Sequence, residues 1–242
     1  MSQTRLIVYL LLMSVLVLFA QDTYLITANT DDGQEIAGSW TDNGTTISVG
    51  LAGGSVVHCA TRFLAINTTA GLVVTTATLR LNFESSNGTA TNFHAKLLGD
   101  DVDDCAALGT THRPTSGWTD TAATLDYDPS SYPSADTFVE FNVATIIQEI
   151  LDRAGWATGN DICLAVKDDT SGANTSMAFE ALDNIETDEP ELVLTLTTAS
   201  TAIKRRMLSN LFKLPPRSET WSYKTSRKPL LISREYASNV RF

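Results

Sequence analysis

Residues 78–84 read Thr78-Leu79-Arg80-Leu81-Asn82-Phe83-Glu84, a stretch in which apolar and polar side chains alternate at every position. Successive side chains of a β-strand point to opposite faces of the sheet. The two leucines and Phe83 are therefore predicted to face a core, while Arg80 and Glu84 face outward. This stretch indicates a half-buried strand and a fold rich in β-sheet.

The same alternation recurs on both sides of this stretch. It is clear at residues 57–63, 93–97, 162–166, 177–179 and 192–196, and weaker at residues 23–27, 45–49, 122–127 and 137–141. In the first of these segments Ala60 blurs the contrast between the two faces. Turn-forming Gly, Asn, Asp and Ser residues separate the segments. Roughly eight to ten short strands joined by polar turns predict an all-β fold, a jelly-roll β-sandwich.

One segment has a helical period instead. Its apolar residues recur at i, i+3, i+4, i+7 and i+8, which places them on one helix face: Val143, Ile146, Ile147, Ile150 and Leu151. Asn142 is expected to cap the start of this helix, and Gly155 is expected to end it. The pattern predicts one short helix lying across an end of the sandwich.

The start of the chain has the composition of a targeting segment. Residues 6–20 carry no charge and follow Arg5, as in a secretory signal peptide, and Ala20 is a suitable residue before a cleavage site. An uncleaved anchor is the alternative, although the apolar run is short for a membrane span. We therefore expect an apolar helix at residues 1–20 as signal or anchor, a jelly-roll binding domain at 21–199, and an extracellular or cell-surface location.

Charge divides the chain near residue 200. The net charge is −11, but residues 1–200 hold seven Lys/Arg against 26 Asp/Glu, whereas residues 201–242 hold ten against two. The segment 200–242, with Lys204, Arg205 and Arg206, is predicted to be a basic, largely extended tail. Such a tail attracts acidic partners, either other structural proteins or further copies of this chain. A solvated extension and a membrane contact at residues 207–212 are the alternatives. Nucleic acid is an expected partner only inside a virus particle.

The three cysteines, Cys59, Cys105 and Cys163, do not have the spacing of a zinc site. In an exported protein one pair can form a disulfide, and the sequence leaves all three pairings open. Three free thiols packed in the core are the alternative.

One turn is strongly acidic. It contains four carboxylates: Asp100, Asp101, Asp103 and Asp104. Calcium takes oxygen ligands of this kind, so the turn is a candidate structural calcium site, although it lacks the spacing of an EF-hand. The alternative is a solvated turn in which Asp104 caps a short helix at residues 105–108.

Three aromatic residues are predicted to lie in polar loops: Trp40, Trp118 and Tyr132. Sugar rings stack on such side chains, and neighbouring carboxylates, here Asp42 and Asp120, can bind sugar hydroxyls. The alternative is that each ring closes an end of the sandwich. A binding role requires some of these rings to gather at one rim.

The motifs of the common enzyme classes are missing from the sequence. His58, His94 and His112 are far apart, and there is no GxSxG elbow, no HExxH and no phosphate-binding glycine loop. We therefore expect a protein without catalytic activity. A polysaccharide lyase, the enzymatic alternative, would need His, Arg and Tyr together in a cleft.

Several short motifs carry a resemblance to a known family. They are Ile147-Gln148-Glu149-Ile150, Arg153-Ala154-Gly155-Trp156, Gly159-Asn160 and Glu189-Pro190-Glu191-Leu192, with residues 99–104 and 121–127. Over residues 22–198 the chain resembles the DNRLRE-type β-sandwich domains, which look like carbohydrate-binding modules. Similar domains occur in secreted bacterial surface proteins and in phage particles. The resemblance implies a jelly-roll fold and a binding or structural role.

The sequence thus favours a non-catalytic, extracellular module that binds a polysaccharide or surface glycan. The alternative is a structural or decoration subunit of a virus particle or surface assembly, with the two termini as assembly arms.

Overall fold

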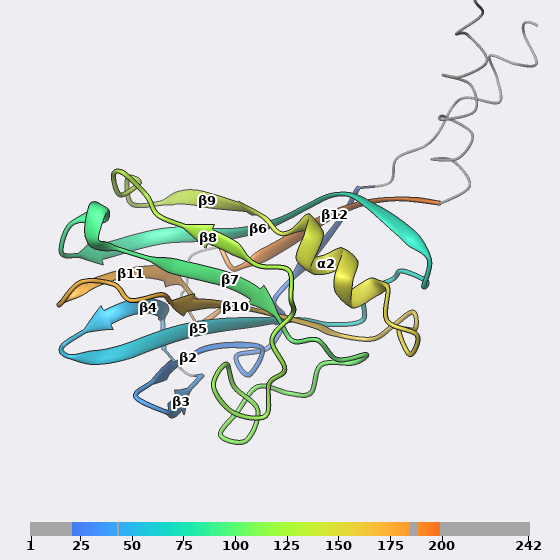
Figure 1. Ribbon diagram of the computed structural model, residues 1–242, viewed down its shortest axis with the longest axis horizontal. Coiled ribbons are helices and arrows are strands. Elements are labelled where there is room, and N and C mark those ends of the chain that lie inside the picture. Colours follow the sequence, from blue (N-terminus) through green and yellow to red (C-terminus); the bar gives the residue numbers. More distant parts are fainter. Residues whose placement is uncertain (1–20, 43, 184–187, 199–242) are drawn as a thin grey trace, which may run out of the picture. The chain divides into compact units, whose positions relative to one another are not determined.

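The computed structural model describes residues 21–42, 44–183 and 188–198, which form one curled antiparallel sheet and confirm the all-β prediction (Figure 1). The signal or anchor predicted at residues 1–20 and the tail predicted at 200–242, with Lys204, Arg205 and Arg206, lie outside the described residues. Within the described ranges, no helix is both long and apolar enough to cross a membrane.

The strands, in chain order, are β1 (Gln21–Leu25), β2 (Asp32–Ile36), β3 (Ser39–Thr41), β4 (Thr46–Ala52), β5 (Ser55–Phe63), β6 (Leu72–Asn87), β7 (Ala95–Gly99), β8 (Leu125–Tyr127), β9 (Thr137–Asn142), β10 (Ile162–Asp168), β11 (Thr175–Glu180) and β12 (Glu191–Thr198). Two helical elements accompany them, η1 (Ala90–Asn92) and α2 (Ala144–Leu151). The predicted strands at residues 57–63, 78–84, 162–166, 177–179 and 192–196 all fall within these elements.

The long strand β6 joins the two halves of the sheet. Along one edge it pairs with β12 from Leu72 to Arg80 and then with β11 from Phe83 to Asn87. Along the other edge it pairs with β9. One half therefore contains β1, β12, β6 and β9, and the other contains β11, β4, β5, β10, β7 and β8. The strand β6 thus belongs to both halves of the curled sheet.

The main core lies between these halves. Leu79, Leu81 and Phe83 of β6 are at most 4% exposed, as their alternation predicted. A second, smaller cluster lies on the opposite face of β5, β7 and β10, and we call it the outer cluster; its members are Ala60, Leu98, Cys105, Leu108, Cys163 and Ala165. Ala60 and Ala165 alternate with core residues, so this part of the sheet is buried on both faces.

The predicted helix is confirmed as α2. Its buried side is made by four of the predicted residues: Ile146, Ile147, Ile150 and Leu151. The N–H of Ala144 donates to Asn142 Oδ1 at 3.2 Å, so Asn142 satisfies the first helical donor although Val143 holds the N-cap position. Gln148 Oε1 accepts the N–H of Val74, which fixes the helix to β6.

Gly155 does not end the helix, because α2 already ends at Leu151. A Cβ at Gly155 would lie 1.9 Å from Asp103 Oδ2. Glycine is therefore needed there for close approach of the acidic turn.

Two further expectations are wrong. Residues 105–108 are not helical; the N–H of Cys105 donates to Asp161 O, just before β10, and Cys105 is joined to Cys163. Asp104 is consequently not a helix cap, and its Oδ1 accepts the N–H of Asp161 at 2.8 Å.

The strand expected at residues 122–127 is shorter, since only Leu125–Tyr127 pairs with β7. The hairpin of β2 and β3 was not predicted at all.

Candidate functional site

The irregular segment at residues 100–121, called here the 100–121 loop, covers the outer face of β5, β7 and β10. A disulfide between Cys105 and Cys163 anchors it to β10. This is one of the three pairings that the sequence left open. Cys59 is free and faces the main core, where burial raises the pKa of its thiol to about 12. The loop and its disulfide therefore replace solvent on that face of the sheet.

A buried carboxylate ties the loop to β2. Glu35 is 1% exposed and accepts hydrogen bonds from Arg113 Nε at 3.0 Å and from the N–H of Thr115 at 3.0 Å. The Thr115 hydroxyl also donates to it. Arg113 and Ser116 bridge each other through both backbone hydrogen bonds, which makes a tight hairpin of this part of the loop. A buried charge needs such partners to be tolerated.

The acidic turn is held by an arginine and by backbone groups. Arg153 donates to Asp101 Oδ1 and Asp103 Oδ1, each at 2.7 Å, and these contacts raise the pKa of the guanidinium. No three of the four predicted calcium ligands, Asp100 included, place oxygens within 4.8 Å of one another. The Arg153 guanidinium therefore already provides a positive charge beside these carboxylates. Calcium binding at the turn stays a prediction.

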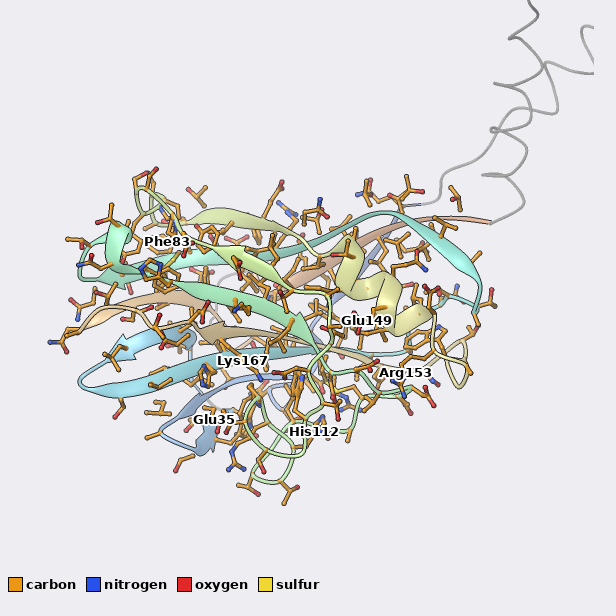
Figure 2. The ribbon with its side chains drawn as sticks, in the orientation of Figure 1. Glu35, Phe83, His112, Glu149, Arg153 and Lys167 are labelled. Atoms are coloured by element: carbon orange, nitrogen blue, oxygen red, sulfur yellow. A yellow bond between two sulfur atoms is a disulfide. The ribbon has the colours of Figure 1, made fainter. Side chains whose placement is uncertain are left out.

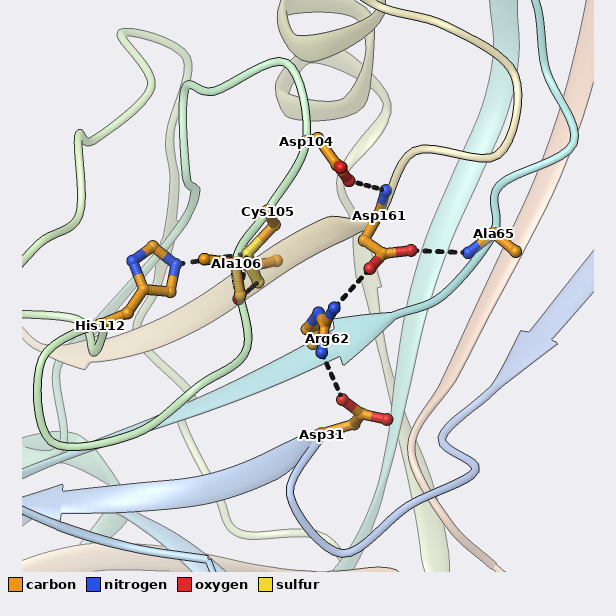
Figure 3. A network of polar contacts seen from close by, with 9 residues as sticks. Asp31, Arg62, Ala65, Asp104, Cys105, Ala106, His112 and Asp161 are labelled. Atoms are coloured by element: carbon orange, nitrogen blue, oxygen red, sulfur yellow. Dashed lines mark hydrogen bonds and ion pairs between the residues drawn. A yellow bond between two sulfur atoms is a disulfide. The ribbon is translucent and has the colours of Figure 1, made fainter.

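A polar network continues from this turn to the edge of β5 (Figure 3). Arg62 binds Asp161 Oδ2 at 2.6 Å and Asp31 Oδ1 at 3.0 Å. Burial raises the pKa of Asp31, whereas the neighbouring Arg62 lowers it. Asp161 Oδ1 accepts the N–H of Ala65 at 2.8 Å. These contacts fix the base of the loop beside the disulfide.

At the centre of the loop, Asp100 faces His112. Asp100 Oδ1 accepts the N–H of Thr119 at 2.8 Å, and Oδ2 lies 3.2 Å from His112 Nε2. Burial raises the pKa of Asp100, while the Thr119 hydrogen bond and the histidine act in the opposite direction. The His112 ring stacks on Trp118 with centroids 5.6 Å apart.

The structure brings two of the three predicted aromatic ligands together. Trp40 and Trp118, both partly exposed, pack on the outer cluster. Tyr132 instead contacts Phe83 and Phe93 of the main core, with ring centroids 6.3 and 6.4 Å away. Figure 2 shows Phe83 near the left end of the sheet and His112 apart from it, among the loops at the lower centre. Tyr132 therefore does not belong to the rim that holds the tryptophans.

The two carboxylates predicted beside these rings differ in their surroundings. Asp120 is exposed and accepts a 2.6 Å hydrogen bond from Lys167 Nζ. Asp42 is partly exposed and directly follows β3, the strand that carries Trp40. Trp40 lies on Gly33 of β2, where a Cβ would come 2.5 Å from the ring. Trp40 is thus at least in part a packing residue.

A concave surface that the sequence did not reveal lies on the other half of the sheet. This sheet-face groove has a volume of about 350 Å³ and crosses β1, β12, β6 and β9; its lining residues are Gln21, Thr76, Thr78, Arg80, Glu140 and Val193. The register explains the grouping: Thr76 and Gln21 both lie opposite Thr195, and Arg80 lies opposite Glu140. Because these side chains alternate with core residues, they form one continuous outer face.

Arg80 dominates the electrostatics of the groove. Its Nε is 3.3 Å from Glu140 Oε1, and its Nη1 donates to Glu191. The guanidinium carbon lies 4.1 Å above the ring centroid of Phe138. The flanking carboxylates and the ring hold the arginine in one position. The sequence did mark Arg80 as outward-facing, but strand pairing was needed to show what shares that face.

The described residues define the class of protein: an all-β protein with a curled antiparallel sheet, a polar groove on one half and a disulfide-anchored loop on the other. No protein-family model matches the chain, and no curated protein shows significant similarity to it. The resemblance to the DNRLRE-type domains therefore stays a prediction from the motifs.

Proposed function

We propose that the protein is an extracellular, non-catalytic carbohydrate-binding module with a jelly-roll β-sandwich fold, and that the sheet-face groove holds the glycan. The observation that carries the proposal is the groove itself, a concave surface of about 350 Å³ lined mainly by polar side chains. Small-ligand sites are typically concave and place a few polar groups to orient the ligand. Sugar hydroxyls donate and accept hydrogen bonds, so hydroxyl, amide, guanidinium and carboxylate groups together complement them.

The groove also supports binding without large rearrangement. Its residues lie on paired strands rather than on loops, and Arg80 is already held by Glu140, Glu191 and the Phe138 ring. A preorganised site loses less entropy when the ligand binds. The described residues that line the groove include neither histidine nor tyrosine, the residues that a polysaccharide lyase needs beside arginine.

The disulfide supports the extracellular location. Cys105 and Cys163 are 2% and 0% exposed and are joined across 58 residues of sequence. Structural disulfides persist in oxidising compartments and outside cells. The tryptophans at the rim of the 100–121 loop provide the alternative location for a glycan.

The test is a screen of the full chain against a panel of polysaccharides, followed by calorimetry with the best ligand. Arg80→Gln should weaken binding about 10- to 100-fold, as expected for loss of hydrogen bonds to a charged group. Lys96→Gln, which removes a partly exposed cation on β7, is the matched control and should leave the affinity unchanged.

The outcomes separate the alternatives. Loss of binding in Trp118→Ala but not in Arg80→Gln would move the site to the loop rim. If the folded protein binds no glycan on the panel, the module proposal fails. The protein would then be treated as a structural subunit of a virus particle or surface assembly.

A further inference from the structure

Three potential metal ligands converge at the disulfide of the 100–121 loop. Cys105 Sγ, Cys163 Sγ and His112 Nε2 all lie within 4.8 Å of one another, the first and last from the 100–121 loop and Cys163 from β10. Among the described residues they form the group of three that could hold a metal ion. The 3.4 Å between Cys105 Sγ and His112 Nε2 is close to the spacing of two ligands around one zinc ion, about 3.3–3.8 Å for the usual bond lengths.

His112 is oriented as metal-binding histidines usually are. Its Nδ1 donates to Gly117 O at 3.0 Å, which leaves Nε2 directed at the sulfurs. A hydrogen bond from the distal ring nitrogen to a carbonyl is the common outer contact of a ligating histidine. Gly117 adopts φ +73°, and a Cβ there would lie 2.3 Å from Thr111 O, so the tight turn that presents this carbonyl needs glycine. Stacking on Trp118 fixes the ring plane.

A buried carboxylate oxygen lies beside the imidazole of this group. Asp100 is 1% exposed, and its Oδ2 accepts no hydrogen bond. The Nε2 atom of His112 is 3.2 Å from that oxygen. A cation bound at Nε2 would therefore lie close to a buried carboxylate, which would attract it.

We propose that the protein with this disulfide reduced binds a thiophilic divalent cation, with Zn²⁺ as the best fit, through Cys105, Cys163 and His112, with the Asp100 carboxylate beside the imidazole. A tertiary phosphine supplies the two electrons: the disulfide, the phosphine and one water give two thiols and the phosphine oxide. Each thiol then loses its proton as its sulfur binds the metal. Two thiolates and an imidazole, with water in the fourth position, form a recognised type of zinc site.

The two states of the site exclude each other, because the same sulfurs either bond to each other or bind the metal. The disulfide belongs to an oxidising environment and the metal to a reducing one. The inference does not depend on glycan binding, since the sheet-face groove lies on the other half of the sheet. Failure of either experiment therefore leaves the other proposal standing.

The test uses Co²⁺ as a spectroscopic substitute for Zn²⁺ in the full chain. After reduction with a water-soluble phosphine, one equivalent of Co²⁺ should produce a thiolate-to-cobalt charge-transfer band and the intense visible bands of a tetrahedral site. Zn²⁺ should displace it. The oxidised protein should show neither band. Circular dichroism monitors the fold throughout, and if reduction alone unfolds the chain, metal should restore the fold at the same stoichiometry.

Variants assign the ligands. His112→Gln and Asp100→Asn should each weaken Co²⁺ binding by about tenfold or more, a conservative figure because outer contacts alone reach 10–100-fold. Cys59→Ser, which changes the free cysteine in the main core, should leave the spectrum intact. Absence of a thiolate band in the reduced protein overturns the proposal. So does a band that forms with unchanged intensity and affinity in Cys163→Ser or His112→Gln.

Discussion

The outer faces of the two halves of the sheet differ in whether the chain covers them. On β6 the outward positions are Thr76, Thr78 and Arg80, which line an open polar groove. On β5 and β10 the corresponding positions are Ala60 and Ala165, each 1% exposed beneath the 100–121 loop. The first face is available to a ligand, and the second is covered by the chain's own loop. Small apolar residues on an outward face thus indicate a cover, and polar ones indicate an open surface.

The largest expected effect concerns the disulfide that attaches the 100–121 loop to β10. Replacing Cys105 and Cys163 with alanine should lower the free energy of unfolding by about 4 kcal/mol, the loop-entropy value for a closed loop of 58 residues. Denaturant unfolding of the purified protein measures it. Cys59→Ala should cost clearly less because that thiol is not cross-linked. Equal losses in the two proteins would show that the disulfide does not stabilise the loop.

The next largest effect is a difference in the free energy of unfolding between two substitutions, one on each outer face. Ala60→Asn places an amide between sheet and loop and should cost about 3 kcal/mol through crowding and unpaired polar atoms. Thr78→Asn on the open face should change the free energy of unfolding by less than about 0.5 kcal/mol. Chemical denaturation of both variants gives the values. Similar costs at the two positions would contradict the distinction between covered and open faces.

These two faces also explain what could be predicted from the sequence. On β6 one face is buried and the other polar, so the period of two is clean and the strand was found. On β5 Ala60 blurred the pattern because that strand is buried on both sides. On β2 the buried positions include Asp32 and Glu35, which accept hydrogen bonds from residues far away in the sequence. No apolar alternation therefore marks the strand.

The candidate sites were harder to predict for the same reason. The sheet-face groove depends on the pairing of β6 with β9 and β12, and no local motif encodes that pairing. The acidic turn looked like a calcium site because Arg153, about fifty residues away in the sequence, could not be assigned to it. His112, Asp100 and the disulfide likewise meet only through the fold.

A third effect depends on pH. The pKa of Asp32 is raised from 3.8 to about 7, chiefly because the carboxyl group is buried. The negative charges of Asp183 and Asp31 raise it further by smaller amounts. The folded protein therefore holds a proton that the unfolded chain has lost between these two values. The free energy of unfolding should accordingly be highest below the lower value and fall as pH rises towards the upper one, by about 2–4 kcal/mol.

Asp32→Asn isolates this contribution. In the natural protein the N–H of Leu182 donates to Asp32 Oδ2 at 2.9 Å. The side-chain oxygen of asparagine can still accept this hydrogen bond, but the amide cannot ionise. The variant should be more stable than the natural protein above neutral pH and should lack its decline between acidic and neutral pH. Urea unfolding at a series of pH values measures both. A decline of equal size in the variant would assign it to other groups.

The smallest effect concerns the acidic turn. Arg153→Gln should cost about 1 kcal/mol, since its two contacts are partly exposed and screened by solvent. Because the natural turn already has its cation, adding calcium should leave the melting temperature of the natural protein unchanged. A clear rise that a chelator reverses would restore the calcium site. Thermal unfolding with calcium and with chelator provides the comparison.

The pairing of β1 with β12 has a mechanical consequence. The two strands are antiparallel neighbours, with Gln21 opposite Thr195, so the first and last described strands have their outer ends side by side (Figure 1). A force pulling Gln21 and Thr198 apart would load the hydrogen bonds between β1 and β12 one pair at a time rather than together. Tension applied through both ends would peel β1 from the sheet before it strained β6, so the edge would yield at low load and the groove would first lose its Gln21 side.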